Sequence, residues 1–373
     1  MTRIVPIVGE ASMKHWQETS RILRSLLNCA EQGRTAALAT VIHIEGSAYR
    51  RPGAKMLILD DGAMLGSVSG GCLEADVREV ALSVMHGGDA RLLHYDTGTD
   101  YQLPFGLGLG CNGSVDIFVQ RAVPDLLEIG GRLTRLLQGD NTFAVCTIVR
   151  GPRAIARSVV VTSRGQRFGS TGDVNLDHRI ATDTNDLLAT GLSQRRDFGG
   201  YEVFVDLQVP PPSLVVFGAG GDTRPLARCA AEVGFRVTVV DHRRAYLASD
   251  GYPAEVRLVE ARADTAAPDI LLGPLTYAVV KTHSVEHDRK WVARLLASDV
   301  PYIGVLGPRA RTEEILRELR SETDERVFGP IGIDLGADGP EQIAVSIVAE
   351  LLARVSGREP MHLRQRESAI HVV

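Results

Sequence analysis

The stretch LVVFGAGGDTRPLARCAAEVGFRVTVVD, residues 214–241, decides the fold of the C-terminal part of the chain. It opens with the apolar run 214–217 and passes through a glycine-rich turn into a helical pattern over 222–233. A second apolar run, 236–240, closes the stretch and is followed by Asp241. A strand, a glycine-rich turn, a helix and a second strand form a βαβ unit, which predicts a parallel sheet.

The same alternation continues toward the C-terminus. Two further strands are expected at 277–282 and 302–306, and helices are expected at 286–296, 312–319 and 342–353. Strands that alternate with helices favour an α/β fold, here a Rossmann-like doubly wound parallel sheet.

A proline-rich segment, DLQVPPPS at 206–213, marks the boundary between two domains. Three consecutive prolines cannot continue a helix or a central strand, so the segment is interpreted as a stiff linker. We therefore expect an N-terminal accessory domain at 1–205, the linker at 206–213, the Rossmann-like domain at 214–355 and a charged tail at 356–373.

The N-terminal domain is predicted to be α/β with an internal duplication. Helices are expected at 16–32 and 73–86, and strands at 36–44, 56–59 and 115–119. Three pairs of similar segments occur in the same order: 37–44 and 143–150, 57–70 and 159–172, 115–120 and 202–207. The second copy shows no counterpart of residues 71–74, so only the first half is expected to carry chemistry.

Composition excludes several classes of protein. The net charge of −5 argues against binding to nucleic acid or to a membrane surface. No run of about 18 apolar residues predicts a transmembrane helix, and the N-terminal residues do not resemble a signal peptide. The five cysteines are scattered and form no C-x-x-C pair, which is typical of a reducing compartment and indicates a cytoplasmic protein.

Three glycine-rich loops in the N-terminal domain form the densest group of candidate site residues, at 45–53, 66–74 and 106–113. Such loops leave backbone N–H groups available for an anion, and a following helix adds its positive end. Arginine is suited to phosphate. The candidate ligand-binding residues in these loops are Ser47, Arg50, Ser69, Gly70, Gly71 and Gly110.

Two cysteines, Cys72 and Cys111, lie in these loops, and Glu74 follows the first of them. A thiol at the start of a helix is available as a nucleophile or as a soft-metal ligand. The competing interpretation is structural: both cysteines fill tight turns, Glu74 favours the first helical turn, and Arg50 lies in a solvated turn.

The glycine turn of the C-terminal domain is close to a dinucleotide-binding fingerprint. Gly218, Gly220 and Asp222 are candidate phosphate contacts, and Asp241 is a candidate ribose contact. His283 follows a predicted strand at the sheet edge where ligands bind, and it is a candidate ligand contact or base. A glycine turn that only packs, and a histidine that only caps a helix, remain the alternatives.

These motifs together resemble the XdhC/CoxI family of xanthine dehydrogenase accessory factors. The resemblance rests on GSVSGGCLE at 66–74, GLGC at 108–111, FGAG at 217–220 and GPIGIDLG at 329–336, in the family's order.

The resemblance implies a chaperone for molybdenum cofactor, as molybdopterin or its dinucleotide. Such a protein supports sulfuration of the cofactor and hands it to a xanthine-dehydrogenase-like or carbon-monoxide-dehydrogenase-like apoenzyme. It implies a cysteine desulfurase as a further partner, and a homodimer. Cys72, Cys111, Glu74 and Arg50 fall on the family's motif positions, and the two cysteines are the candidate molybdenum contacts through the bound cofactor.

Two other functions stay open from the sequence. One is an NAD(P)-dependent oxidoreductase that uses the Rossmann domain, with His283 as the acid or base. The other is an interaction scaffold whose loops dock a partner enzyme and bind no small ligand.

Overall fold

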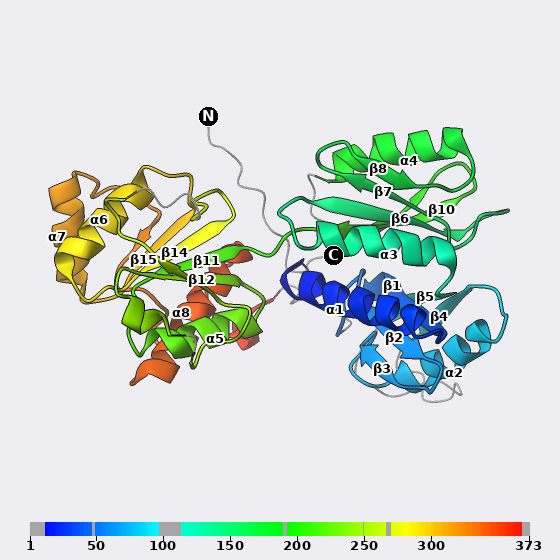
Figure 1. Ribbon diagram of the computed structural model, residues 1–373, viewed down its shortest axis with the longest axis horizontal. Helices are drawn as coiled ribbons and strands as arrows, with labels where there is room; N and C mark the ends of the chain where they lie inside the picture. Colours follow the sequence, from blue (N-terminus) through cyan, green and yellow to red (C-terminus); the bar gives the residue numbers. More distant parts are fainter. Residues whose placement is uncertain are drawn as a thin grey trace. The chain divides into compact units, whose positions relative to one another are not determined.

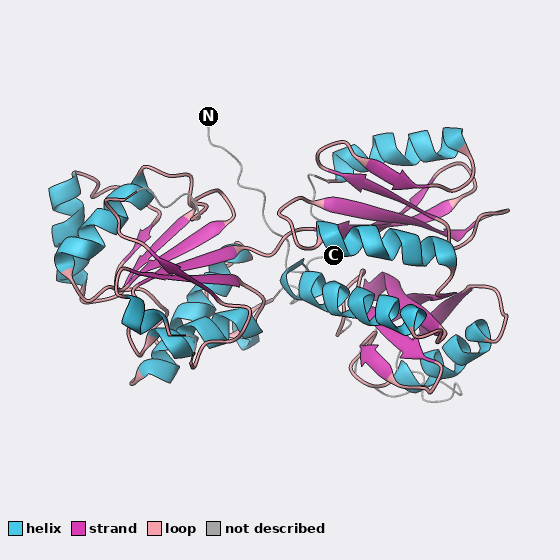
Figure 2. Ribbon diagram, viewed as in Figure 1, coloured by secondary structure: helices cyan, strands magenta, loops and turns pink. Residues whose placement is uncertain are grey.

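The computed structural model describes residues 12–46, 49–96, 113–188, 192–248, 250–265 and 270–367 (Figure 1). The described chain forms two compact units, Lys14–Pro210 and Pro211–Gln365, and both combine helices with sheets (Figure 2).

The unit Pro211–Gln365 is built on one six-stranded sheet in which every pair of neighbouring strands is parallel. Its strands are β11 (Ser213–Phe217), β12 (Arg236–Asp241), β13 (Arg257–Glu260), β14 (Thr276–Val280), β15 (Tyr302–Val305) and β16 (Val327–Phe328). They lie in the order β13-β12-β11-β14-β15-β16, which is the order of a doubly wound dinucleotide-binding sheet. The predicted Rossmann-like α/β fold is confirmed.

Helices cover both faces of this sheet (Figure 1). On one face lie α5 (Thr223–Glu232) and α8 (Pro340–Val355), which pack against each other, and on the other lie α6 (Val285–Leu296) and α7 (Arg309–Leu319). The ring of Trp291 on α6 lies 4.1 Å from that of Phe217 at the end of β11. Packing of this helix on the sheet therefore fixes the strand end that precedes the glycine turn.

The unit Lys14–Pro210 contains two five-stranded antiparallel sheets. The first sheet has the order β3-β2-β1-β5-β4, and the second has the order β8-β7-β6-β10-β9. Their strands are β1 (Ala36–Gly46), β2 (Lys55–Leu59), β3 (Met64–Gly66), β4 (Arg91–Asp96), β5 (Gly113–Arg121), β6 (Phe143–Arg150), β7 (Ser158–Thr162), β8 (Arg167–Gly169), β9 (Gln194–Asp197) and β10 (Glu202–Gln208).

Each half has one helix at the same place in the chain, after the third strand of its sheet and before the fourth. The helix α2 (Glu74–Met85) packs on β1 and β5, and α4 (Val174–Leu187) packs on β7. Two further helices, α1 (Ser12–Glu31) and α3 (Pro124–Leu136), share one apolar core with strands of both sheets. The indole N–H of Trp16 on α1 donates to the carbonyl of Leu137 after α3, at 3.0 Å.

The repeated strand order supports the predicted duplication. Gly66 and Gly169, at the ends of β3 and β8, both have positive φ angles, +87° and +77°. A Cβ on either glycine would lie 2.4 Å from a carbonyl oxygen, that of Lys55 in the first half and of Ser158 in the second. Both halves therefore require glycine at the equivalent turn, and the offset between them is 103 residues.

The two sheets meet through an apolar cluster that contains Phe118 and Phe204. Next to it, Lys55 of the first half donates to Asp206 of the second at 2.6 Å, and both side chains are buried. Asp206 and Gln208 belong to β10, so the segment between β10 and β11 is 209–212, shorter than the expected linker. The apolar alternation of β10 continues into the residues that the sequence assigns to the linker.

Candidate functional site

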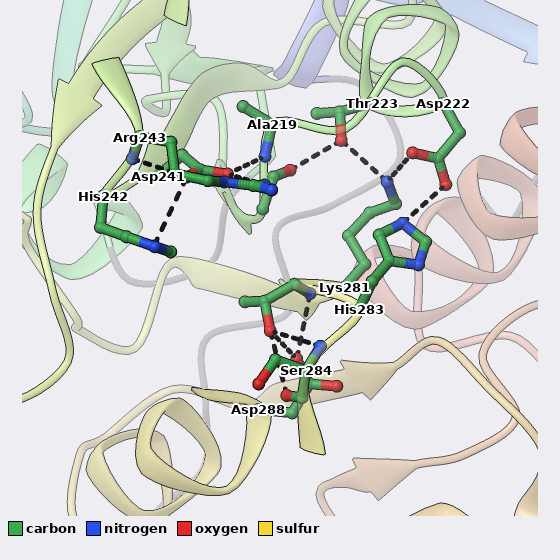
Figure 3. Close-up of polar contacts among 12 residues, drawn as sticks. Ala219, Asp222, Thr223, Asp241, His242, Arg243, Lys281, His283, Ser284 and Asp288 are labelled. Atoms are coloured by element: carbon green, nitrogen blue, oxygen red, sulfur yellow. Dashed lines mark hydrogen bonds and ion pairs between the residues drawn. The ribbon is translucent and has the colours of Figure 1, made fainter. Parts of the chain in front are cut away.

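The glycine turn 218–222 joins β11 to α5 at the edge of the sheet where the strands end (Figure 3). Gly218 has φ +114°, and a Cβ there would lie 2.4 Å from the carbonyl oxygen of Lys281. Thr223, at the third position of the predicted fingerprint, is fully buried and donates its hydroxyl to the Gly218 carbonyl at 2.7 Å. A side-chain hydrogen bond thus closes the turn where a third glycine is usual.

Asp241, the predicted ribose contact, is buried, and both its oxygens are hydrogen-bonded within the protein. Its carboxylate accepts from the Ala219 amide at 2.8 Å, from the Arg243 amide at 2.9 Å and from two nitrogens of the Arg243 guanidinium (Figure 3). Burial raises the pKa of Asp241, but the hydrogen bonds from Arg243 and Ala219 outweigh it and lower the pKa to about 2. The carboxylate is therefore not open to a ribose hydroxyl in this structure.

Lys281 lies directly after β14 and is 2% exposed. Its ammonium donates to Asp222 at 2.6 Å and to the hydroxyl of Thr223 at 2.8 Å (Figure 3). Burial lowers the pKa of Lys281, and the ion pair with Asp222 opposes that effect. Lys281 is absent from the predicted site residues, although a lysine at the end of an apolar strand run is a signal that the sequence contains.

His283 is 60% exposed at its side chain, and its Nε2 lies 3.7 Å from Asp222. Its backbone has φ +60°, a left-handed conformation that is uncommon for a non-glycine residue. The turn is held by the fully buried carboxylate of Asp288, which accepts from the amide and hydroxyl of Thr282 and from Arg311. The predicted residues Gly218, Gly220, Asp222 and His283 therefore share one site with Lys281, while Asp241 is occupied by Arg243.

The loop 66–74 of the first half is organised by Ser69 and Glu74. The Ser69 hydroxyl accepts from the amides of Gly71, Cys72 and Leu73, each at 3.1 Å, and donates to the Glu74 carboxylate. Burial raises the pKa of Glu74, but hydrogen bonds from the hydroxyl and amide of Ser69 outweigh it, so the pKa lies below its ordinary value. The three amides that a glycine-rich loop offers to an anion are thus satisfied by the protein itself.

This loop presents Cys72 to solvent at the start of α2. The Cys72 thiol lies 3.5 Å from the Ser69 hydroxyl. Its exposure makes the structural interpretation of Cys72, a small residue buried in a turn, wrong. Beside the loop, the ring of Tyr49 lies next to Gly70, and the Tyr49 side chain is 79% exposed.

Arg50 forms an ion pair with Glu18 of α1, and both side chains are largely buried. The partner of Arg50 is therefore a carboxylate of the protein, and the interpretation of Arg50 as a residue of a solvated turn is wrong. Ser47, Gly110 and Cys111 lie outside the described residues.

The expectation that the second half has no counterpart of residues 71–74 is wrong for two of these positions, and it holds for Gly71 and Cys72, where the second half has Val174 and Asn175. At the 103-residue offset, Leu73 and Glu74 correspond to Leu176 and Asp177. Asp177 accepts from the amide of Thr171 at 2.8 Å and from the hydroxyl of Ser170 at 2.6 Å, as Glu74 does from Ser69. The sequence hides this correspondence because aspartate replaces glutamate and the hydroxyl donors shift along the loop.

Neither a metal cluster nor a membrane span is found in the part of the chain that the structure describes. There, no group of three His, Cys, Asp or Glu side chains could hold a metal ion. None of the described helices is long and apolar enough to cross a membrane.

Comparison with known proteins follows the same division of the chain. Residues 214–351 match the XdhC Rossmann domain, and residues 29–96 match the XdhC and CoxI family. A probable xanthine dehydrogenase subunit from Bacillus subtilis (strain 168) is 32% identical over 322 residues, which cover 86% of this chain and 94% of that protein. The chain belongs to the XdhC and CoxI family.

One solved structure matches most of this XdhC and CoxI family chain, and one further protein matches about a third of it. A crystal structure of a xanthine dehydrogenase from Bacillus halodurans superposes with a TM-score of 0.75 at 27% identity, covering 91% of this chain and 96% of that one. The molybdenum cofactor insertion chaperone PaoD of Escherichia coli (strain K12) is 32% identical over 131 residues, 32% of this chain and 40% of the chaperone.

Proposed function

We propose that this protein is a molybdenum-cofactor accessory protein that serves a molybdenum hydroxylase of the xanthine dehydrogenase class. Membership of the XdhC and CoxI family supports the partner class, and the similarity to an insertion chaperone supports the cargo. In this proposal the cofactor is cargo that the protein binds and hands on.

The single observation that carries the proposal is the exposed Cys72 thiol on a loop fixed by Ser69 and Glu74. Thiolate sulfur is a ligand that soft metals prefer, and a fixed loop holds it without ordering cost when the cargo arrives. Cys72 would face the molybdenum as a transient thiolate ligand or as a sulfur acceptor. Because both oxygens of Glu74 hold the loop, we assign it the role of a positioning residue.

The phosphate end of the cofactor has a candidate site at the glycine turn of the Rossmann domain. Lys281 supplies a buried positive charge there. Gly218 lets the turn pass close to the backbone of Lys281, and Gly220 lies against the side chains of Asp222 and His283. Binding of NAD(P) stays a prediction, and the engagement of Asp241 by Arg243 disfavours it because a ribose finds no free acceptor. Sulfuration with a cysteine desulfurase, a homodimer and a cytoplasmic location also stay predictions.

The proposal is tested by cofactor retention. The purified protein is incubated with molybdenum cofactor and desalted, and retained pterin is measured as its oxidised fluorescent product, with NAD retention measured alongside. We expect pterin to be retained, and NAD not to be.

Variants then locate the thiol function. Cys72→Ala and Cys111→Ala are compared with Asn175→Ala, which changes the position equivalent to Cys72 in the second half. Cys72→Ala is expected to reduce activation of the partner apoenzyme at least about tenfold, while Asn175→Ala leaves it unchanged. Wild-type retention and activation in both cysteine variants would remove the cysteines from the mechanism, and retained NAD without pterin would favour a dehydrogenase.

A further inference from the structure

The ion pair between Lys281 and Asp222 lies at the place where a Rossmann-like sheet binds a phosphate. In sheets of this strand order, the phosphate of a ligand lies over the glycine turn and at the start of the following helix. Here that helix is α5, and Asp222 is the residue immediately before it. The ammonium of Lys281 is directed at the same point, with Asp222 and Thr223 as its acceptors.

The carboxylate of Asp222 covers the glycine where a ligand would approach. A Cβ built on Gly220 would lie 2.8 Å from Asp222 Oδ1 and 3.4 Å from His283 Nε2. The second glycine of the fingerprint normally lets a pyrophosphate approach the backbone. Asp222 makes no capping hydrogen bond to the helix, so its carboxylate is held at this position by Lys281.

A pocket of about 150 Å³ opens beside the pair, between α5 and α8. Its only charged lining residues, in the part of the chain described, are Asp222 and Lys281. Its other walls are apolar residues and the first turn of α8: Leu226, Gly339, Pro340, Ile343, Ala344 and Ile347. An anionic group that enters this pocket meets the negative Asp222 unless that side chain moves away from the lysine.

The two partners differ in their freedom to move. The Asp222 side chain is 27% exposed, whereas that of Lys281 is 2% exposed. The carboxylate can rotate into solvent, while the lysine is surrounded by protein and needs an anion beside it. Burial lowers the pKa of Lys281, and the ion pair with Asp222 opposes this effect. Burial raises the pKa of Asp222, but the ion pair with Lys281 outweighs burial, so the pKa of Asp222 lies below its ordinary value. Each charge therefore depends on the other.

We propose that Asp222 is an internal substitute for a ligand phosphate, and that a phosphate-bearing ligand binds by displacing Asp222 from Lys281. The inference rests on the proposed function only for the identity of the natural ligand, which is then the phosphate end of the molybdenum cofactor. Only a ligand whose phosphate binds Lys281 more strongly than the Asp222 carboxylate does can then occupy the site. A neutral or singly charged ligand does not displace it.

The test measures binding of inorganic pyrophosphate, and separately of AMP, to the full chain by titration calorimetry. Asp222→Asn removes the competing charge but keeps the side-chain shape, so pyrophosphate is expected to bind at least about tenfold more tightly than to the wild type. Lys281→Met is expected to abolish binding. Asp324→Asn is the matched control, because Asp324 pairs with Arg326 in the same unit and lines no part of this pocket.

The outcomes are distinguishable. Equal or weaker pyrophosphate binding by Asp222→Asn overturns the inference, and so does an absence of binding to every variant. Asp222→Ser serves as the second variant where Asp222→Asn does not fold. A stronger effect for AMP than for pyrophosphate identifies a nucleotide rather than the phosphate alone as the ligand. Failed pterin retention with a tightened Asp222→Asn site would refute the proposed function and leave this inference intact.

Discussion

The two halves of the unit Lys14–Pro210 have the same scaffold, but only the first presents a thiol. Each has a glycine with positive φ against a neighbouring carbonyl, and each has a carboxylate in the first helical turn that holds the preceding loop. At the position of Cys72 the second half has Asn175, whose amide donates to Asp173 rather than to a serine hydroxyl. The glycine and the carboxylate therefore belong to the scaffold, and the exposed cysteine is what distinguishes the first half.

We expect the largest loss of stability from a substitution that breaks the ion pair between the two halves. Lys55→Met leaves the buried Asp206 carboxylate without its cation, and we expect a loss of about 3–5 kcal/mol in the free energy of unfolding. Lys55→Met with Asp206→Leu should lose less than the sum of the two single changes. Urea unfolding of the four proteins measures this coupling, and additive losses would show that the pair does not join the halves.

The equivalent glycines test whether the two scaffolds are alike. Gly169→Ala and Gly66→Ala should each lower stability by about 2–3 kcal/mol, since both combine positive φ with a Cβ at 2.4 Å from a carbonyl. Gly165 has the same φ as Gly169 within a degree, +76° against +77°, but nothing lies near its Cβ. Gly165→Ala should therefore cost only about 1 kcal/mol. Equal losses at 165 and 169 would show that the close carbonyl contact is unimportant.

The carboxylates of Glu74 and Asp177 each accept a hydrogen bond from an amide of the loop that precedes their helix. Glu74→Gln and Asp177→Asn should each cost about 1–2 kcal/mol, because each weakens charge-assisted hydrogen bonds to its loop. Hydrogen–deuterium exchange should show faster exchange at 69–73 in the first variant and at 171–176 in the second.

The Glu74 contribution also depends on pH. Its folded-state pKa is lowered, so the stabilisation is present above the ordinary glutamate pKa of about 4.3 and is lost as the pH falls through the folded value. Glu74→Gln should remove this part of the acid sensitivity. An unchanged acid transition in that variant would contradict the role given to Glu74.

The smallest effect on stability concerns the cysteines. Cys72→Ser should change stability by no more than about 0.5 kcal/mol, because the thiol is exposed. Cys146, in the second sheet, is fully buried, and burial raises its pKa to about 12. Peptide mapping after brief alkylation of the native protein should find Cys72 modified and Cys146 intact. Equal labelling of both would contradict the division between a presented thiol and a core thiol.

Local patterns predicted most of the fold. The glycine turn after 214–217 and the three prolines are signals within a few residues, so the βαβ unit and the domain boundary could be inferred. Some of the missing strands carry weak signals: β16 has two residues, β13 is a short edge strand, and β4 is only partly buried. The helices α3 and α4 were also not predicted, although they have 13 and 14 residues and each buries an apolar face.

The partners of the site residues were not predictable from sequence. Lys281 meets Asp222 across 59 positions, and Arg50 meets Glu18 across 32, so folding alone brings these charges together. The Ser69 hydroxyl accepts hydrogen bonds from three amides of its own loop. Residue spacing does not distinguish such a loop from one whose amides remain available to an anion. The sequence therefore predicts where the loops lie, and the structure shows which of their polar groups are already hydrogen-bonded within the protein.

The packing of Trp291 on Phe217 has an optical consequence. The chain has two tryptophans, and each compact unit contains one of them, Trp16 in the first and Trp291 in the second, both buried. Phe217 directly precedes Gly218 and packs on Trp291, so we expect a ligand at the glycine turn to change the surroundings of the Trp291 indole. In a Trp16→Phe background, intrinsic emission reports on the Rossmann domain alone. In a Trp291→Phe background it reports on the duplicated domain, so the chain carries a separate natural fluorophore for each of its units.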